Sequence, residues 1–204
     1  MKKIILIVTS TMIVLPINSQ SFNKIINSNS YTIECMASRK CKDGVKRIYD
    51  ISDISSSYPD SDFDIIADEF NRMLATLKRI GIKVFLGDEK YFPKHYRGIY
   101  STRRNNFYLN DAYAYNPKSL IGTMRHEGWH VAQDCKAGIH NMKLDTIIEE
   151  KNIPPIFSNV VEKIYADEPD QIPYEKGAFW ASIRKDATQK ALESCVSGKL
   201  RFTY

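Results

Sequence analysis

The chain has 204 residues, of which 43% are hydrophobic and 26% charged, and its formal net charge at pH 7 is +5. A mildly basic chain with mixed charges does not indicate a nucleic-acid partner, and the small cluster Arg97, Arg103 and Arg104 is interpreted as a solvated loop. The length suffices for one domain with a hydrophobic core.

Residues 1–20 are typical of a secretory signal peptide. Lys2 and Lys3 form a basic start, and residues 4–17 are an apolar run of the right length, too short for a membrane span. Cleavage is expected near Ser19 or Gln20, and an uncleaved signal anchor is the alternative. We therefore expect a secreted or periplasmic protein without stable membrane insertion after cleavage.

Residues 21–58 are polar and irregular and are interpreted as an N-terminal arm or a propeptide-like segment that could cover a cleft. Short strands are expected at 31–33 and 45–51. The remaining residues, 59–204, are expected to form one folded domain.

An amphipathic helix is predicted at 61–80, because its apolar residues keep helical spacing and Gly81 can end it. Ser61 and Asp64 resemble a capping box.

A strand is predicted at 82–86, and 98–101 and 107–109 are predicted to form a β-hairpin. The free edge of such a strand can bind an extended peptide by strand addition, and an ordinary sheet strand is the alternative.

The next helix is predicted from Asn116, a good N-cap, and Pro117, which suits the first turn, to a stop at Gly138. An apolar stripe marks the face that packs on the core. His126 and His130 point to the opposite side, together with Gln133, whose role is interpreted as structural.

This helix carries the H-E-x-x-H sequence His126-Glu127-Gly128-Trp129-His130. Residues four apart lie on one helix face, so the two imidazoles can grip one Zn²⁺. Glu127 lies beside the ion, where it can take a proton from water. The alternative is a helix with two surface or salt-bridged histidines, and Trp129 is expected to pack against a neighbouring helix.

Downstream, helices are predicted near 144–151 and 156–166, and one long helix at 173–197. The order of elements indicates an α+β fold: a small mixed β-sheet packed on the H-E-x-x-H helix and further helices in a single domain.

A hydrolytic zinc site needs a third protein ligand and an open position for water. Glu175 is preferred, because small residues follow it and let its helix approach the first one closely. The competitors are Glu168, Asp167, Asp170 and His140. The alternative for Glu175 is a solvated glutamate favoured by the helix dipole.

The H-E-x-x-H sequence with Gln133, followed by Glu-x-x-Ala from Glu175, resembles the gluzincin metallopeptidases, closest to their small bacterial members. The resemblance covers about residues 82–195. It implies His126, His130 and Glu175 as zinc ligands and Glu127 as general base. The chain departs from the family pattern in the long segment before Glu175 and in Phe179, where an Asp is common.

Four cysteines in an exported chain suggest two disulfides among three possible pairings. Cys35–Cys41 and Cys135–Cys195 are preferred, the second because it would join the two helices that carry the ligands. A thiolate of Cys35 or Cys41 that blocks the zinc in a latent form is an alternative.

The predicted function is that of a peptidase with one Zn²⁺ per chain, acting on a peptide or protein substrate through metal-activated water. Candidate donors to the transition state are Tyr165, Tyr174, His140 and Arg184. The alternatives are a zinc amidase acting on cell-wall peptidoglycan, and a binding module that keeps the fold without hydrolysis.

Overall fold

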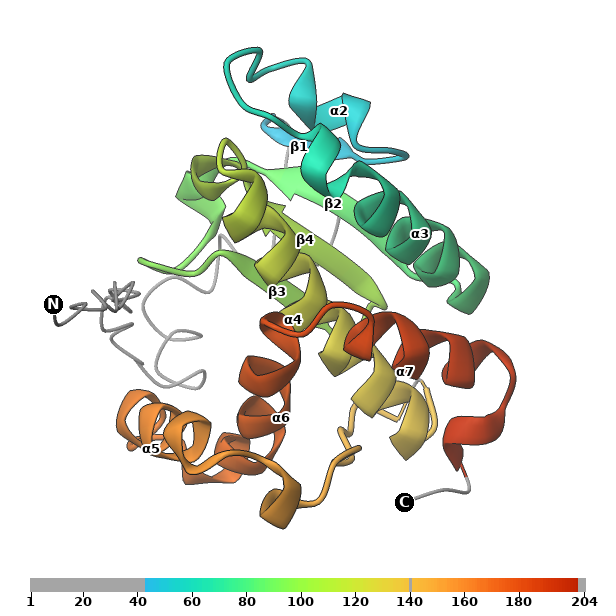
Figure 1. Ribbon diagram of the computed structural model, residues 1–204, viewed down its shortest axis with the longest axis vertical. Coiled ribbons are helices and arrows are strands. Elements are labelled where there is room, and N and C mark those ends of the chain that lie inside the picture. Colours follow the sequence, from blue (N-terminus) through green and yellow to red (C-terminus); the bar gives the residue numbers. More distant parts are fainter. Residues whose placement is uncertain (1–42, 140, 202–204) are drawn as a thin grey trace, which may run out of the picture.

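The structure is a computed structural model, which describes residues 43–139 and 141–201 (Figure 1). The expected signal peptide, the strand at 31–33, the Cys35–Cys41 disulfide and His140 lie outside these residues. The described part has the α+β fold that the sequence predicts. The strands are β1 (Val45–Arg47), β2 (Lys83–Gly87), β3 (Gly98–Ser101) and β4 (Asn106–Asn110). The helices are α2 (Ser52–Ser55), α3 (Asp64–Ile80), α4 (Pro117–Ala137), α5 (Pro155–Ile164), α6 (Ile172–Ser182) and α7 (Ala187–Val196).

The four strands form one mixed sheet in the order β1-β2-β4-β3. The central strands β2 and β4 are parallel, with Phe85 opposite Tyr108, and both outer strands are antiparallel to their neighbours. The predicted hairpin is confirmed as β3 and β4. Among the described residues β3 pairs along one edge only, and the strand also contacts α4.

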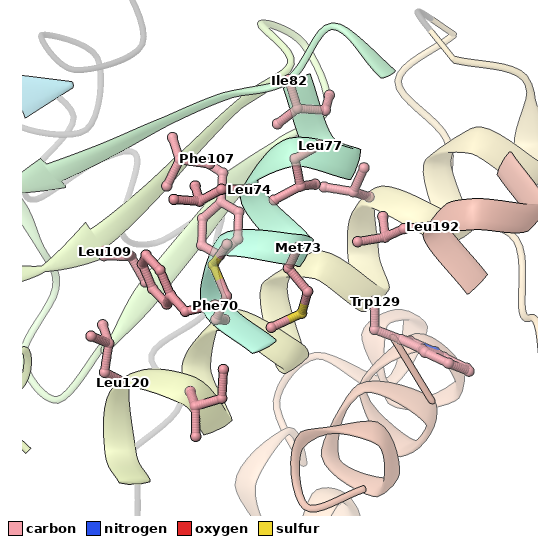
Figure 2. Packing of buried hydrophobic residues seen from close by; sticks show 14 of the residues in the cluster. Phe70, Met73, Leu74, Leu77, Ile82, Phe107, Leu109, Leu120, Trp129 and Leu192 are labelled. Carbon is pink, nitrogen blue, oxygen red and sulfur yellow. The ribbon is translucent and has the colours of Figure 1, made fainter. Parts of the chain in front are cut away.

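The main core lies between the sheet and the helices α3, α4 and α7 (Figure 2). The helical spacing of α3 turns its apolar side chains toward β4 and α4. The labelled side chains of this core are Phe70, Met73, Leu74, Leu77, Ile82, Phe107, Leu109, Leu120, Trp129 and Leu192. A smaller cluster of Phe92, Ile99 and Tyr108 covers the opposite face of the sheet.

Helix α3 ends at Gly81 as predicted, in the left-handed conformation that glycine adopts without strain. Its predicted start is wrong by three residues. The Ser61 hydroxyl donates to the Tyr115 carbonyl and so does not cap the helix, whereas the Asp62 carboxylate accepts the backbone N–H of Asp64.

The segment 21–58, interpreted as an arm, is described only from residue 43, and that part belongs to the domain. Strand β1 pairs with β2, and Ile48, Ile51 and Ile54 are buried in the main core. The predicted boundary between the arm and the domain, at residue 58, is therefore too far along the chain. Three isoleucines that precede it, spaced by three residues, are already buried.

Two helix predictions differ from the structure. Residues 144–151 are irregular apart from a short 3₁₀ turn at Glu150–Asn152, and contacts with neighbouring elements fix them. The helix expected at 173–197 is broken at 183–186 into α6 and α7, with Asp186 in the left-handed region at φ +69°. The two pieces can then pack on different sides of α4.

The predicted disulfide Cys135–Cys195 is confirmed, with 6.0 Å between the Cα atoms. Because the last helix is broken, this disulfide ties α4 to α7 and not to α6, which carries Glu175.

Candidate metal centre

Helix α4 carries the H-E-x-x-H sequence and is the central helix of the molecule. The Asn116 side chain accepts the N–H of Ser119, Pro117 occupies the first turn, and Gly138 ends the helix with φ +96°. All three predictions for its ends are therefore confirmed. In Figure 1, α6 and α7 pack around its C-terminal half, so its polar face is covered as well as its apolar stripe.

The predicted ligands His126, His130 and Glu175 come together between α4 and α6. Nε2 of His126 and Nε2 of His130 are 3.3 Å apart. The Glu175 carboxylate lies 3.2 Å from the first nitrogen and 3.3 Å from the second. These three side chains form a group that could hold a metal ion.

The donor atoms fit a small tetrahedral ion. Donors about 2.0–2.1 Å from such an ion lie about 3.3–3.4 Å from one another. The two Nε2 atoms are at this separation, and each lies 3.2–3.3 Å from a different carboxylate oxygen of Glu175. The side chains of His126, His130 and Glu175 are 17%, 9% and 12% exposed, so the group is largely shielded from water. Two imidazoles and one carboxylate are a ligand set that zinc accepts.

Gln133 fixes the orientation of His130. Its side chain is fully buried, its Nε2 donates to the carbonyl of Tyr174, and its Oε1 lies 2.8 Å from Nδ1 of His130. Since Oε1 can only accept, Nδ1 carries the hydrogen, and the Nε2 lone pair of neutral His130 points at the other two ligands. The structural role expected for Gln133 is thus explained by its contacts.

His126 has different surroundings. Its ring meets the ring of Phe179 edge-on, with centroids 5.2 Å apart and planes at 80°. Phe179, at which the chain departs from the gluzincin pattern, therefore packs directly against a candidate ligand. Its aromatic ring stands where that pattern commonly has a carboxylate.

The charges of the group are coupled. Burial lowers the pKa of His130, but the Glu175 carboxylate outweighs burial and raises that pKa from 6.5 to about 9. Burial raises the pKa of Glu175, yet His130 and His126 together hold it far below its ordinary value. At neutral pH, Glu175 is therefore an anion, and a proton on His130 competes with any metal ion.

Glu127 lies beside the three ligands and against β3. Burial raises the pKa of its carboxyl group, while the neighbouring histidines and the backbone N–H of Tyr100 lower it. The strand approaches closely here, since a Cβ on Gly98 would lie 2.8 Å from Cγ of Glu127. A buried carboxylate with a raised pKa beside such a group suits proton transfer.

Of the candidate donors, the structure brings Tyr165 to the site. Its buried hydroxyl forms a hydrogen bond with Glu175, and burial and this carboxylate raise its pKa. Tyr174 contributes its backbone carbonyl, to Gln133. Arg184 is exposed and stacks on Trp180 with its Cζ 4.5 Å from the ring centre, so it is not at the site.

Lys176, next to Glu175, holds α5 and the irregular segment before it against α6. Its Nζ is buried and lies 2.5 Å from Glu150 and 2.8 Å from Glu162. Since Tyr165 follows the last residue of α5, Lys176 also supports the wall that carries this tyrosine.

The remaining predicted residues are outside the ligand group. Asp167 and Asp170 are exposed and Glu168 is half-buried in the connection to α6, so these competitors do not join the two histidines. Trp129 packs on Trp180 of α6 as expected, with ring centroids 5.6 Å apart.

Two tyrosines at the site were not predicted. Tyr100 holds Glu127 through its backbone, and Tyr96 is a half-buried residue whose pKa is raised by burial and by Glu168, Glu175 and Glu127. The available signal was the predicted hairpin just before the H-E-x-x-H helix, which brings residues 96–101 close to α4.

No described helix is both long and apolar enough to cross a membrane. Comparisons of the chain with protein families, with curated proteins and with solved structures find no match in any of the three. The function is therefore inferred from the geometry of this site.

Proposed function

We propose that the protein is a zinc-dependent peptidase of the gluzincin type, with His126, His130 and Glu175 as ligands and Glu127 as general base. The observation that carries the proposal is the close approach of two histidine Nε2 atoms, 3.3 Å apart, to the two carboxylate oxygens of Glu175, at 3.2 and 3.3 Å, beside a buried glutamate. Structural ion pairs also bring histidine and glutamate together. A structural ion pair of this kind does not require a second carboxylate beside it. Here Glu127, the residue after His126, is buried, and the pKa of its carboxyl group is raised.

The chemistry then divides among the side chains. A bound zinc ion supplies Lewis acidity, which lowers the pKa of a contacting water and polarises a carbonyl. Glu127 takes the proton of the attacking water and passes it to the leaving amine. The Tyr165 hydroxyl, held beside Glu175, donates a hydrogen bond to the developing oxyanion. Gln133 keeps His130 in the orientation that the ion needs.

An extended peptide is the substrate that the surroundings favour. Within the described residues β3 pairs along one edge only and lies against Glu127, and an unpaired edge can bind an extended chain through backbone hydrogen bonds. The bond to be cleaved would then lie along β3 with its carbonyl toward the ligands. The disulfide Cys135–Cys195 supports an exported location, since disulfides persist in oxidising compartments.

The first experiment is the zinc content of the purified chain after reconstitution and dialysis. We expect about one zinc per chain, lost in His130→Ala and Glu175→Ala. Glu168→Gln is the matched control and keeps the metal. Thermal unfolding of each variant shows whether it is folded. A folded wild type that takes up no zinc rejects the proposal.

The second experiment separates peptidase activity from other uses of the metal. Glu127→Gln keeps zinc but reduces hydrolysis of denatured casein by about 10²–10⁴-fold. Cleavage of muropeptides with casein left intact would make the protein an amidase. Zinc binding with no hydrolysis of either substrate would make it a binding module.

A further inference from the structure

The N-terminal end of β3 lies with its backbone directly on α4. A Cβ on Gly98 would come within 2.7 Å of Cγ2 of Thr123 and 2.8 Å of Cγ of Glu127, so there is no room for a side chain. The strand therefore fits against the general base closely enough that a small shift of β3 would move the groups that contact Glu127.

Tyr100 joins this strand to α4 at two points. Its backbone N–H donates to the Glu127 carboxylate. Its hydroxyl donates to Oδ2 of Asp134, 2.6 Å away, and Asp134 is fully buried. Glu127 and Asp134 are seven residues apart, so they lie two turns apart on one face of α4. Tyr100 thus contacts α4 at both Glu127 and Asp134.

The second attachment matters because β3 is an edge strand. Hydrogen bonds to β4 hold one of its sides, and among the described residues no strand holds the other. The buried hydrogen bond to Asp134 supplies an additional fixed point, on the face of the strand that packs on α4. It sets where the Tyr100 amide lies along α4.

We propose that Tyr100 is a positioning residue for Glu127, acting through its hydrogen bond to Asp134; this inference depends on the proposed role of Glu127 as general base. The Tyr100 side chain does not reach the reacting atoms. It acts by holding the backbone donor that orients the Glu127 carboxylate, and a displacement of about 1 Å in such a site costs about 100-fold in rate.

The test compares three single variants of the zinc-loaded chain on fluorescein-labelled denatured casein. Tyr100→Phe should keep one zinc per chain and a KM within about twofold, while kcat falls by about 10–100-fold. Tyr108→Phe is the matched control. It also loses the hydroxyl of a buried sheet tyrosine, which accepts from Asn106 at 3.1 Å, but it lies on the opposite face of the sheet. Asp134→Asn keeps an acceptor for the Tyr100 hydroxyl and should retain most of the activity.

Amide hydrogen exchange gives a readout that does not need a substrate. The amide at position 100 should exchange slowly in the wild type, Tyr108→Phe and Asp134→Asn, and fast in Tyr100→Phe. If casein is not cleaved by the wild type, the proposed function fails, and the exchange rates alone decide the positioning role. Equal kcat and equal exchange rates in Tyr100→Phe and Tyr108→Phe would overturn the proposal.

Discussion

Helix α4 meets α6 on one side and α7 on the other, and the two contacts are built differently. Both bring a glycine close to a side chain: Gly177 of α6 lies against Trp129, and Gly128 of α4 lies against Thr188. The α6 contact carries Gln133 and the candidate ligands, and no disulfide crosses it within the described residues. The α7 contact carries the disulfide. We infer that the first contact serves metal binding and the second serves stability.

The largest expected effect is on the α7 side. Replacing Cys135 and Cys195 together by serine opens a loop closed by a 60-residue separation, which lowers the unfolding free energy by about 4 kcal/mol. Zinc affinity below the unfolding transition should change by less than about threefold, because no ligand lies on α7. Denaturant unfolding and zinc titration measure the two quantities. A large loss of zinc affinity in the folded variant would contradict the inference that the α6 contact serves metal binding and the α7 contact serves stability.

A buried glutamine on each side gives the next comparison. Gln133→Met removes the acceptor for His130 and should weaken zinc binding by about 10–100-fold, or about 1.4–2.7 kcal/mol. Gln189→Met is the matched change on α7, where the amide donates to Thr76 at 2.9 Å and to Glu193 at 2.6 Å. It should lower stability and leave zinc affinity unchanged. Equal zinc affinities in the two variants would show that Gln133 does not orient His130.

The two glycines provide a sharper pair. An alanine Cβ at 177 would lie 2.8 Å from Nε1 of Trp129, and one at 128 would lie 2.8 Å from Cγ2 of Thr188. Overpacking costs about 1–3 kcal/mol, offset by about 1 kcal/mol of helix propensity, so each variant should lose up to about 2 kcal/mol of stability. Only Gly177→Ala should also weaken zinc binding, because it pushes α6 away from α4. Thermal unfolding with and without zinc tests this, and a zinc effect in both variants would argue against it.

The smallest effect is the response to pH. Since Glu175 raises the pKa of His130 to about 9, zinc displaces about one proton near neutral pH, and its apparent affinity should rise about tenfold from pH 7 to 8. Calorimetry in buffers of different ionisation enthalpy measures that proton. Without metal, the raised pKa of His130 stabilises the fold fully below pH 6.5, and this contribution is lost as the pH rises through about 9. Zinc binding without proton release would mean that His130 is already neutral.

The sequence predicted the α4 side of the site better than the α6 side, for physical reasons. Asn116, Pro117 and Gly138 are local signals, and the four-residue spacing of His126 and His130 needs only one helix. The break after Ser182 has no glycine or proline to mark it. It is imposed by the packing of α6 and α7 on different sides of α4, and no local pattern contains that information.

The same limit explains the residues that were missed. Tyr100 and Asp134 are far apart in sequence, and their hydrogen bond depends on how the hairpin docks on α4. The irregular segment at 144–151 has a helix-like pattern, yet its Glu150 pairs with Lys176 and its Asp145 N–H donates to the Gln133 carbonyl. Contacts of this kind can override local propensity.

Lys176 gives the wall behind Tyr165 an unusual dependence on the solution. The ammonium group is buried, but its partners Glu150 and Glu162 are 72% and 52% exposed. Ions from the solvent can therefore reach the carboxylates and screen the attraction, with a Debye length that shortens from about 10 Å at 0.1 M to about 3 Å at 1 M. The ligands themselves are shielded from this screening. If Tyr165 is the oxyanion donor that we propose, ionic strength should loosen it without releasing the zinc, so that salt lowers turnover and leaves zinc content unchanged.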